Sequence, residues 1–438
     1  EVTKTKENAK KFGSCELRTY RLAVACTGEY AAAVGGGTVT GALAAQVTTM
    51  NRVNGIYERD MAVTLTIIGN NNLIIYTNAS TDPYTNNSAG ALIGENQTNV
   101  DAVIGSSNYD IGHVFTTGGG GLAGFGVVCS NSSKARGVTG RSNPQGDAYD
   151  IDYVAHEIGH QFGGSHSFNN SCSGNRNNST AYEPGSGSTI MAYAGICTPN
   201  VKNNSDDFFH GISLEQIGDF ITTNGNSCAV KTPLTNNAPI ITSTNIDGSI
   251  TIPANNPFAL TANATDADGD ALTYTWEQMD KDISDQPPLG TSTDGPNFRA
   301  FKPAANNTRY FPRLILIQGG GPYTWEKLPT VSRTMNFRAV VRDNASGGGC
   351  NDHADASITI DENSGPLLVT SPNSVGAYWN VGHNYDVMWD VAGTDAAPVS
   401  CSKVDIFLSI DNGNSFPIQL ANDVDNNGVA SIVAPNNV

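Results

Sequence analysis

The chain has 438 residues, with 24 Lys and Arg against 41 Asp and Glu, so its formal net charge is −17. This acidity argues against nucleic-acid binding, which needs clustered Lys and Arg, and against docking on anionic membranes. No apolar run approaches the ~20 residues of a membrane-spanning helix. Asn, Gly, Ser and Thr replace the missing charged residues, which predicts a loop-rich, β-rich globular protein of roughly two to four domains.

Eight cysteines are scattered along the chain, and no C-x-x-C pair occurs among them. Zinc-ribbon and thioredoxin motifs are therefore absent, and the even number is typical of disulfides in an exported protein. Residues 1–14 are polar and Lys-rich, and we interpret them as a leader or linker from which any signal peptide has been removed. We accordingly expect a secreted protein, extracellular or at the cell surface.

Residues 15–233 mix strand and helix patterns. Alternating and three- or four-residue apolar spacings predict, in chain order, a strand over 17–25, a helix over 40–60, strands over 62–68 and 73–76, a helix over 89–104 and a strand over 111–117. Residues 129–150 have a loop-like composition, and a short helix begins at Asp150. A further helix covers 213–223, with Ser213 as its N-cap. The order of elements predicts an α+β domain with a twisted mixed sheet.

The pattern changes at about Pro233, and no helix is predicted after it. Short alternating segments predict strands at 249–252, 272–277, 313–317, 336–341, 356–360, 385–389, 403–409 and 429–433. These are typical of immunoglobulin-like β-sandwiches, and we expect one over 238–362 and a second over 366–438. The second is small and stops directly after a strand, as a truncated module would.

Three of the seven histidines fall within His156-Glu157-Ile158-Gly159-His160, followed by Gly163 and His166. On a helix, His156 and His160 project from one face and can share a metal, while the carboxylate of Glu157 reaches a water on that metal. Gly163 favours the positive φ that ends the helix and returns the chain to His166. Three imidazoles leave an open position, which predicts a catalytic zinc site.

The run HEIGHQFGGSH resembles the extended zinc motif of the metzincin metalloproteases. The resemblance covers roughly residues 15–230 and looks most like the bacterial reprolysin/adamalysin-like branch. It implies a zinc-dependent endopeptidase, with Glu157 as general base. It also implies that Met191, 25 residues after His166, is the Met-turn methionine beneath the metal, although a plain core methionine is the alternative.

The family resemblance also implies a substrate-binding rim and two disulfides. Gly121, Leu122, Ala123 and Gly124 resemble the edge strand that pairs with an extended peptide, although a flexible loop is the alternative. The segment containing Ala194 and Gly195 would help to form the pocket for the residue that follows the cut. Cys129 and Cys228, and Cys172 and Cys197, stand where the family places disulfides. Subtraction leaves the pairs Cys15–Cys26 and Cys350–Cys401.

Two features depart from the reprolysin/adamalysin-like pattern. Tyr193, two residues after Met191, has the placement found in astacins, serralysins and pappalysins, where it ligates zinc or donates a hydrogen bond to the reaction intermediate. A packing tyrosine is the alternative, and His166-Ser167-Phe168 keeps a pappalysin-like assignment open. Arg21 stands where an acidic calcium ligand is expected, so an ion pair with Asp110 would replace that calcium.

A second metal site is suggested by Asp266, Asp268 and Asp270, which are spaced two apart around Gly269. Carboxylates at this spacing suit a hard cation such as calcium and resemble the calcium loops of PKD- and cadherin-like modules. The EF-hand pattern is incomplete, and a solvated turn between strands is the alternative.

The sequence therefore predicts a secreted, monomeric zinc endopeptidase that hydrolyses peptide bonds of extracellular proteins. The alternative function is a surface adhesin, or a protein that binds matrix or glycans, in which the β-sandwiches dominate and the protease domain is secondary.

Overall fold

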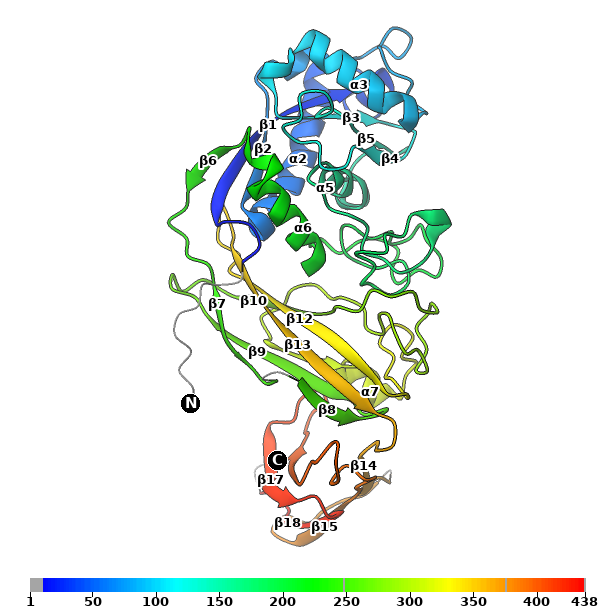
Figure 1. Ribbon diagram of the computed structural model, residues 1–438, viewed down its shortest axis with the longest axis vertical. Coiled ribbons are helices and arrows are strands. Elements are labelled where there is room, and N and C mark those ends of the chain that lie inside the picture. Colours follow the sequence, from blue (N-terminus) through cyan, green and yellow to red (C-terminus); the bar gives the residue numbers. More distant parts are fainter. Residues whose placement is uncertain (1–10, 247–248, 375, 437–438) are drawn as a thin grey trace.

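The computed structural model describes residues 11–246, 249–374 and 376–436. Along the longest axis of the molecule lie a mixed α/β domain, a middle region of β-sheets and a smaller terminal region of β-strands (Figure 1). Most of the predicted leader, 1–10, lies outside the described residues. The fold class thus has a mixed α/β part followed by β-sheets, as the sequence predicts, while the immunoglobulin-like identity of those sheets stays a prediction.

The first domain is built on one mixed sheet with the order β2-β1-β3-β5-β4, and β6 also pairs with β1. The strands are β1 Glu16–Cys26, β2 Val63–Ile67, β3 Ile111–Thr116, β4 Gly121–Ala123, β5 Gly137–Gly140 and β6 Val230–Pro233. β1, β2, β3 and β5 pair in parallel, whereas β4 runs antiparallel to β5. The short strand β4 therefore forms the free edge of the sheet.

Helices cover both faces of this sheet. They are α1 Gly28–Val34, α2 Val39–Met61, α3 Ala89–Val103 and α6 Gly211–Thr222. Alternate residues of β1 explain the two cores, because Leu22 packs with α2 and α6 whereas Ala23 packs with α3. Among the described residues, none of the helices has both the length and the apolar character that crossing a bilayer requires.

Four predicted local features are wrong. Residues 73–76 are not a strand, because the Asn71 side chain bonds both the N–H and the C=O of Val24 and a short 3₁₀ turn, Asn71–Ile74, forms instead. The predicted loop contains β5, whose glycines hide the strand pattern. His210, not Ser213, caps α6 by accepting from the Ile212 N–H. Residues 314–319 form helix α7, since a short apolar run fits either structure.

The middle region consists of two facing sheets, ordered β10-β12-β13-β8 and β11-β9-β7. Its strands are β7 Ile240–Thr244, β8 Ser249–Pro253, β9 Phe258–Thr265, β10 Thr273–Gln278, β11 Thr308–Phe311, β12 Arg333–Arg342 and β13 Asn351–Asp361, and α7 is Leu314–Gly319. Four phenylalanines stack between the sheets and form the core: Phe258, Phe298, Phe311 and Phe337.

The terminal region contains the sheets β14-β15-β18 and β16-β17. Its strands are β14 Leu368–Ser371, β15 Asn384–Asp390, β16 Lys403–Leu408, β17 Ile418–Asp425 and β18 Val429–Val433. Its hydrophobic core is small and is centred on the buried residues Val387, Trp389 and Ile432.

Three disulfides are present among the described residues. Cys129–Cys228 and Cys172–Cys197 are paired as the family resemblance implies. The pairs Cys15–Cys26 and Cys350–Cys401 are wrong, because Cys15 bonds Cys350. Cys15 and Cys26 flank the extended strand β1 and so lie too far apart to bond, which leaves Cys26 free and buried and Cys401 free. The Cys15–Cys350 bond instead joins the first domain to the middle region.

A buried ion pair crosses the same boundary. Asp60, at the end of α2, and Arg342, at the end of β12, are both 0% exposed, and Arg342 Nε lies 3.3 Å from Asp60 Oδ1. Arg342 Nη2 also donates to the Phe209 carbonyl at 2.9 Å. Burial would raise the pKa of Asp60, but Arg59 and Arg342 outweigh it and hold that pKa below its usual value. The first domain and the middle region are therefore coupled through an ion pair that is buried from solvent.

We predict that Asp60→Asn lowers the free energy of unfolding by about 3 kcal/mol or more, because it leaves Arg342 buried without a charged partner. Since an unfolded Asp has a pKa of about 3.9, the stabilisation is complete above that pH and is lost as the pH falls towards the lower folded value. Denaturant unfolding at a series of pH values measures both effects.

The control is Asp219→Asn, which removes an exposed carboxylate from α6. Equal stability of the two variants at neutral pH would contradict the structural role of the Asp60–Arg342 pair.

Candidate metal centre and active site

The two motif histidines lie on a continuous helical segment that ends at the centre of the first domain. It comprises α4 Asp147–Tyr149, a wider π-type segment Asp150–Ala155 and α5 His156–Gln161. π-type turns are rare and often occur at functional sites. Gly163 follows with φ +84°, as its position in the motif predicts, and the chain turns back to His166.

The three histidines form one cluster whose possible ligand atoms lie within 4.8 Å of one another. Each Nδ1 lies 2.7 Å from a backbone carbonyl: that of Ile190 for His156, Gly164 for His160 and Asn175 for His166. Because a carbonyl can only accept, every Nδ1 carries the proton and every Nε2 keeps its lone pair.

The Nε2 atoms provide the test of whether a metal fits. His160 Nε2 and His166 Nε2 are 3.0 Å apart, and His156 Nε2 is buried without a hydrogen-bond partner in the described structure. Burial lowers the pKa of all three imidazoles, for His160 to about 3, so they are neutral donors at physiological pH. Three neutral nitrogen ligands that converge in this way suit zinc.

Glu157 lies beside the histidines, against the edge strand. It is 6% exposed, and burial raises its pKa to about 8. A Cβ added to Gly121 would come within 1.9 Å of Glu157 Oε1, so the carboxylate lies directly against this position of β4 and a larger residue there would displace it. The carboxylate and the backbone of β4 are therefore direct neighbours.

Met191 and Tyr193 approach the histidines from the following segment. Met191 is fully buried, and a Cβ on Gly159 would meet its Sδ at 2.4 Å, so the thioether packs directly against the α5 backbone. The Tyr193 ring centroid lies 4.5 Å from that of His166 and 5.6 Å from that of His156. The structure thus brings both predicted residues to the histidine cluster.

Glu183, a carboxylate that no sequence motif singles out, holds this segment together. It is 1% exposed and accepts hydrogen bonds from the Ser167 hydroxyl at 2.6 Å, the Ser188 N–H at 2.7 Å and the Thr189 N–H at 3.1 Å. Glu183 therefore ties the residue after His166 to the turn that precedes Met191. Since Ile190 supplies the carbonyl for His156, the same network orients two of the three imidazoles.

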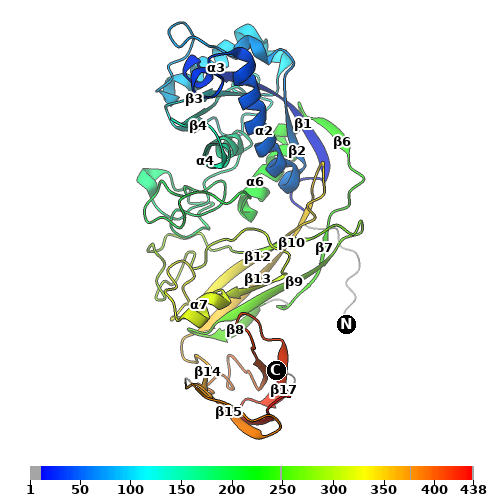
Figure 2. The ribbon, with the colours of Figure 1, turned by 180° about the vertical axis from the view of Figure 1, so that it is seen from behind.

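The middle region supports this segment from below, where the chain between 162 and 210 lies against the loops of the sandwich (Figure 2). Asn169 Nδ2 donates to the Asp282 carbonyl at 3.1 Å, and the Gly185 N–H donates to Gln286 Oε1 at 2.7 Å. The Ser188 hydroxyl donates to the Ala300 carbonyl. The β-region is therefore in direct contact with the part of the chain that carries the third histidine and Met191.

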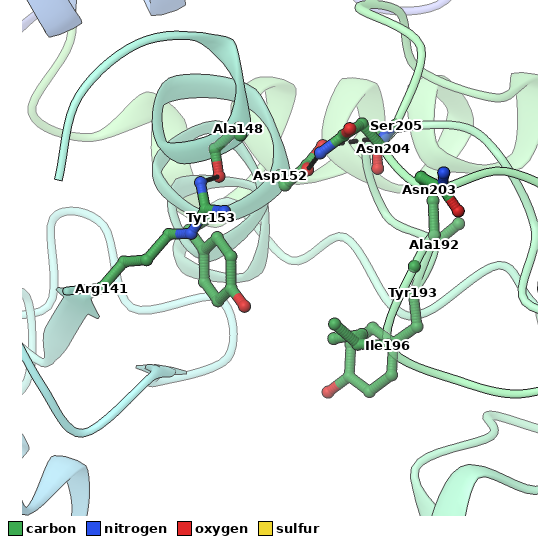
Figure 3. A pocket seen from close by; sticks show the side chains of 12 residues that line it. Arg141, Ala148, Asp152, Tyr153, Ala192, Tyr193, Ile196, Asn203, Asn204 and Ser205 are labelled. Atoms are coloured by element: carbon green, nitrogen blue, oxygen red, sulfur yellow. Dashed lines mark hydrogen bonds between the residues drawn. The ribbon is translucent and has the colours of Figure 1, made fainter. Parts of the chain in front are cut away.

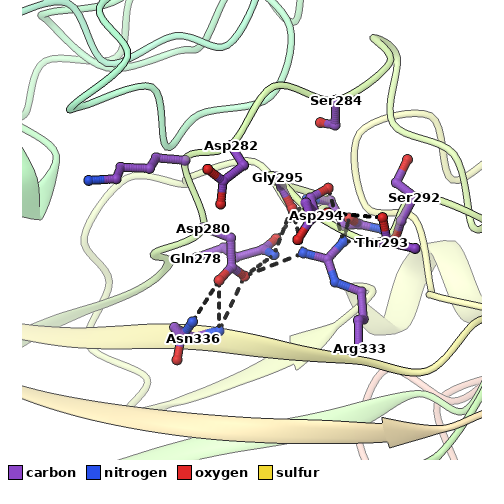
Figure 4. A network of polar contacts seen from close by, with 12 residues as sticks. Gln278, Asp280, Asp282, Ser284, Ser292, Thr293, Asp294, Gly295, Arg333 and Asn336 are labelled. Atoms are coloured by element: carbon purple, nitrogen blue, oxygen red, sulfur yellow. Dashed lines mark hydrogen bonds and ion pairs between the residues drawn. The ribbon is translucent and has the colours of Figure 1, made fainter.

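The contacts from the middle region come from the loop between β10 and β11, residues 279–307. This loop is itself fixed by a polar network (Figure 4). Arg333, on β12, donates to the Gly295 carbonyl at 2.8 Å and lies 3.7 Å from the Asp280 carboxylate. Asp280 also accepts from Gln278 Nε2 and from Asn336 Nδ2, each at 2.7 Å. The network anchors the start of this loop, at Asp280, and its middle, at Gly295, to β12.

The predicted rim residues lie along the edge and beside a cavity. Leu122 and Ala123 belong to β4, whose outer side is unpaired among the described strands, and Gly124 continues it. Ala194 and Gly195 line a cavity of about 170 Å³ next to Tyr193 (Figure 3). Arg141 and Asp152, for which the sequence analysis assigns no functional role, line the same cavity.

The acidic loop of the middle region is assembled differently from the prediction. Asp266 and Asp270 cluster with the buried Asp343 instead of Asp268, whose carboxylate accepts from the Asn237 N–H at 2.6 Å. Calcium binding there stays a prediction. The Arg21–Asp110 ion pair is present, with Nη2 and Oδ1 2.7 Å apart.

We predict that Glu183→Gln weakens metal retention by about 10- to 100-fold, because a neutral amide cannot accept hydrogen bonds from all of these donors. Metal content after dialysis against graded chelator concentrations measures the effect. Glu362→Gln, at an exposed position far along the chain, is the control. Unchanged retention in Glu183→Gln would contradict this orienting role.

Comparison with known protein families gives a match in the first domain. The model of the family described as metallo-peptidase family M12B, reprolysin-like, matches residues 16–219. No curated protein sequence matches the chain. Two Dscam structures, one of them the N-terminal four Ig domains of Dscam1 isoform 6.44, share 13% identity over 37% of this chain, with a TM-score of 0.16. The match spans 36% of those chains, and so low a TM-score establishes no common fold.

The family match covers the sheet, the helix with His156 and His160, the third histidine and Met191. The match over residues 16–219 therefore supports a metzincin-type metalloprotease domain that is similar to the reprolysin-like group of metallopeptidase family M12B.

Proposed function

We propose that the protein is a secreted, zinc-dependent endopeptidase that cleaves extracellular proteins. The observation that carries this proposal is the convergence of three neutral imidazoles beside the Glu157 carboxylate and the free edge of β4. Zinc, when bound by His156, His160 and His166, would act as a Lewis acid at the scissile carbonyl and the attacking water.

The side chains of this domain supply the proton transfers and the positioning. Glu157 accepts a proton from the attacking water and passes it to the leaving amine, and its buried position next to β4 suits that role. The Tyr193 hydroxyl donates a hydrogen bond to the oxyanion that develops on the carbonyl oxygen, and the position of its ring beside His166 supports this role. The substrate lies extended along Leu122 and Ala123, paired through main-chain hydrogen bonds.

Two further observations support the finer parts of the proposal. Three disulfides are typical of an oxidising compartment and so support secretion. The sandwich contacts Asn169, Gly185 and Ser188 directly, which supports a role of the middle region within the protease and not as a separate adhesive module.

We predict that Glu157→Gln lowers kcat/KM on a casein-derived peptide by about 10²- to 10⁴-fold, because the amide cannot accept the proton. Zinc content should stay at one equivalent, since Glu157 is not a ligand. Steady-state kinetics and metal analysis of the same preparation measure both quantities. Wild-type cleavage by the zinc-loaded variant would rule out this mechanism.

We also predict that a chelator abolishes cleavage and that added zinc restores it, whereas added calcium does not. Circular dichroism of the apoprotein should show a retained fold, because the sheet and its two cores do not include the metal. Cleavage that persists after metal analysis shows no zinc would contradict the proposal.

A further inference from the structure

The cavity beside Tyr193 is lined by a charged guanidinium, that of Arg141, which bears on the substrate class of the proposed endopeptidase. The family resemblance implies that the segment with Ala194 and Gly195 helps to hold the side chain of the residue after the scissile bond, and we propose that the Arg141 guanidinium in this cavity favours Asp or Glu at that position. The inference rests on the proposed function.

The walls of the cavity place it immediately after the site of cleavage. One wall is the helix one turn before His156, through Asp152 and Tyr153, and the opposite wall is the chain from Tyr193 onward, through Tyr193 and Ile196 (Figure 3). A peptide that runs along β4 past Glu157 reaches this space with its next side chain. The volume of about 170 Å³ suits a single side chain, since sites for small-molecule ligands usually exceed ~300 Å³.

The Arg141 guanidinium makes few contacts with other protein groups. Its Nη1 donates to the Ala148 carbonyl at 2.8 Å, which fixes the guanidinium against the helix. Among the described residues, no carboxylate lies within 4.0 Å of the Arg141 guanidinium. Its hydrogen bond to the protein is the one that it donates to the Ala148 carbonyl. A guanidinium has five N–H donors in a planar fork that matches a carboxylate. Most of these donors therefore remain for a ligand.

Asp152 is the other charged residue that lines the cavity, and its carboxylate is engaged in the wall. Oδ2 accepts from Asn204 Nδ2 at 2.6 Å, and Oδ1 accepts from the Ser205 N–H at 2.8 Å. These bonds join the metal-bearing helix to the segment around 203–205 and direct the carboxylate away from Arg141 (Figure 3). The remaining lining side chains are uncharged. The Arg141 charge also acts on Asp152, where it opposes the rise in pKa that burial causes, but the Asp152 oxygens are already hydrogen-bonded, whereas most of the guanidinium N–H groups are not.

The test compares peptides that differ only in the residue after the cut. A quenched fluorescent peptide that the zinc-loaded full chain cleaves at one mapped bond is resynthesised with Glu, Gln, Asp, Asn, Leu and Lys at that position. Gln and Asn match the acids in shape without the charge. We expect kcat/KM for Glu over Gln, and for Asp over Asn, to be about ten- to a hundredfold higher, as for a hydrogen bond to a charged group.

Two variants assign the preference to Arg141. Arg141→Ala should reduce the Glu-to-Gln ratio to about one, and Arg141→Glu should favour Lys over Glu, a gain that misfolding cannot produce. Lys231→Ala removes one positive charge from an exposed position on β6 and should keep the wild-type ratio. Zinc content and melting temperature are measured for each preparation.

The outcomes separate this inference from the proposed function. If peptides are cleaved without preference for an acid, with a preference for Lys, or with an acid preference that survives in Arg141→Ala, the inference fails and the endopeptidase proposal stands. If the zinc-loaded chain cleaves no peptide or protein, the proposed function fails and the inference fails with it.

Discussion

The candidate metal centre depends on three hydrogen bonds from imidazole Nδ1 to backbone carbonyls. Each bond fixes the orientation of a ring and leaves its Nε2 lone pair free for a metal. Only the carbonyl that holds His160 lies in the turn directly after its helix. The carbonyls of Ile190 and Asn175 belong to the long segment between 162 and 210, so the order of that segment decides whether the ligands converge.

That segment has little regular secondary structure, and specific polar contacts hold it instead. The buried Glu183 carboxylate accepts hydrogen bonds from Ser167, Ser188 and Thr189. In such a buried position a carboxylate with several donors is strongly favoured over one without them. The Cys172–Cys197 disulfide closes the same segment. The middle region then contacts it from outside through Asp282 and Gln286. The protease domain and the adjoining β-sheets are thus one mechanical unit, reinforced by the Asp60–Arg342 pair and the Cys15–Cys350 bond.

Much of the candidate site could be predicted because its chemistry is local in the chain. The spacing of His156 and His160 places both on one helical face, and Gly163 supplies the positive φ that brings back His166. The strands and helices with strong apolar periodicity, such as 17–25 and 40–60, were also predicted within a few residues. Local prediction fails where a side chain replaces a backbone pairing, as Asn71 does, or where an apolar run fits both a strand and a helix, as 314–319 does.

The sequence by itself pointed to His156, His160 and His166 as candidate metal ligands and to the neighbouring Glu157, because the spacing of the motif constrains these residues. The pairings Cys129–Cys228 and Cys172–Cys197 came from the family resemblance. Only the tertiary structure decided that Cys15 bonds Cys350, that Asp343 replaces Asp268 in the acidic cluster, and that Glu183 and Arg141 face the active site. These residues are separated from their partners by loops of unpredictable course. Their pairing follows from how the sheets and the long segment pack, and no local spacing in the chain encodes that packing.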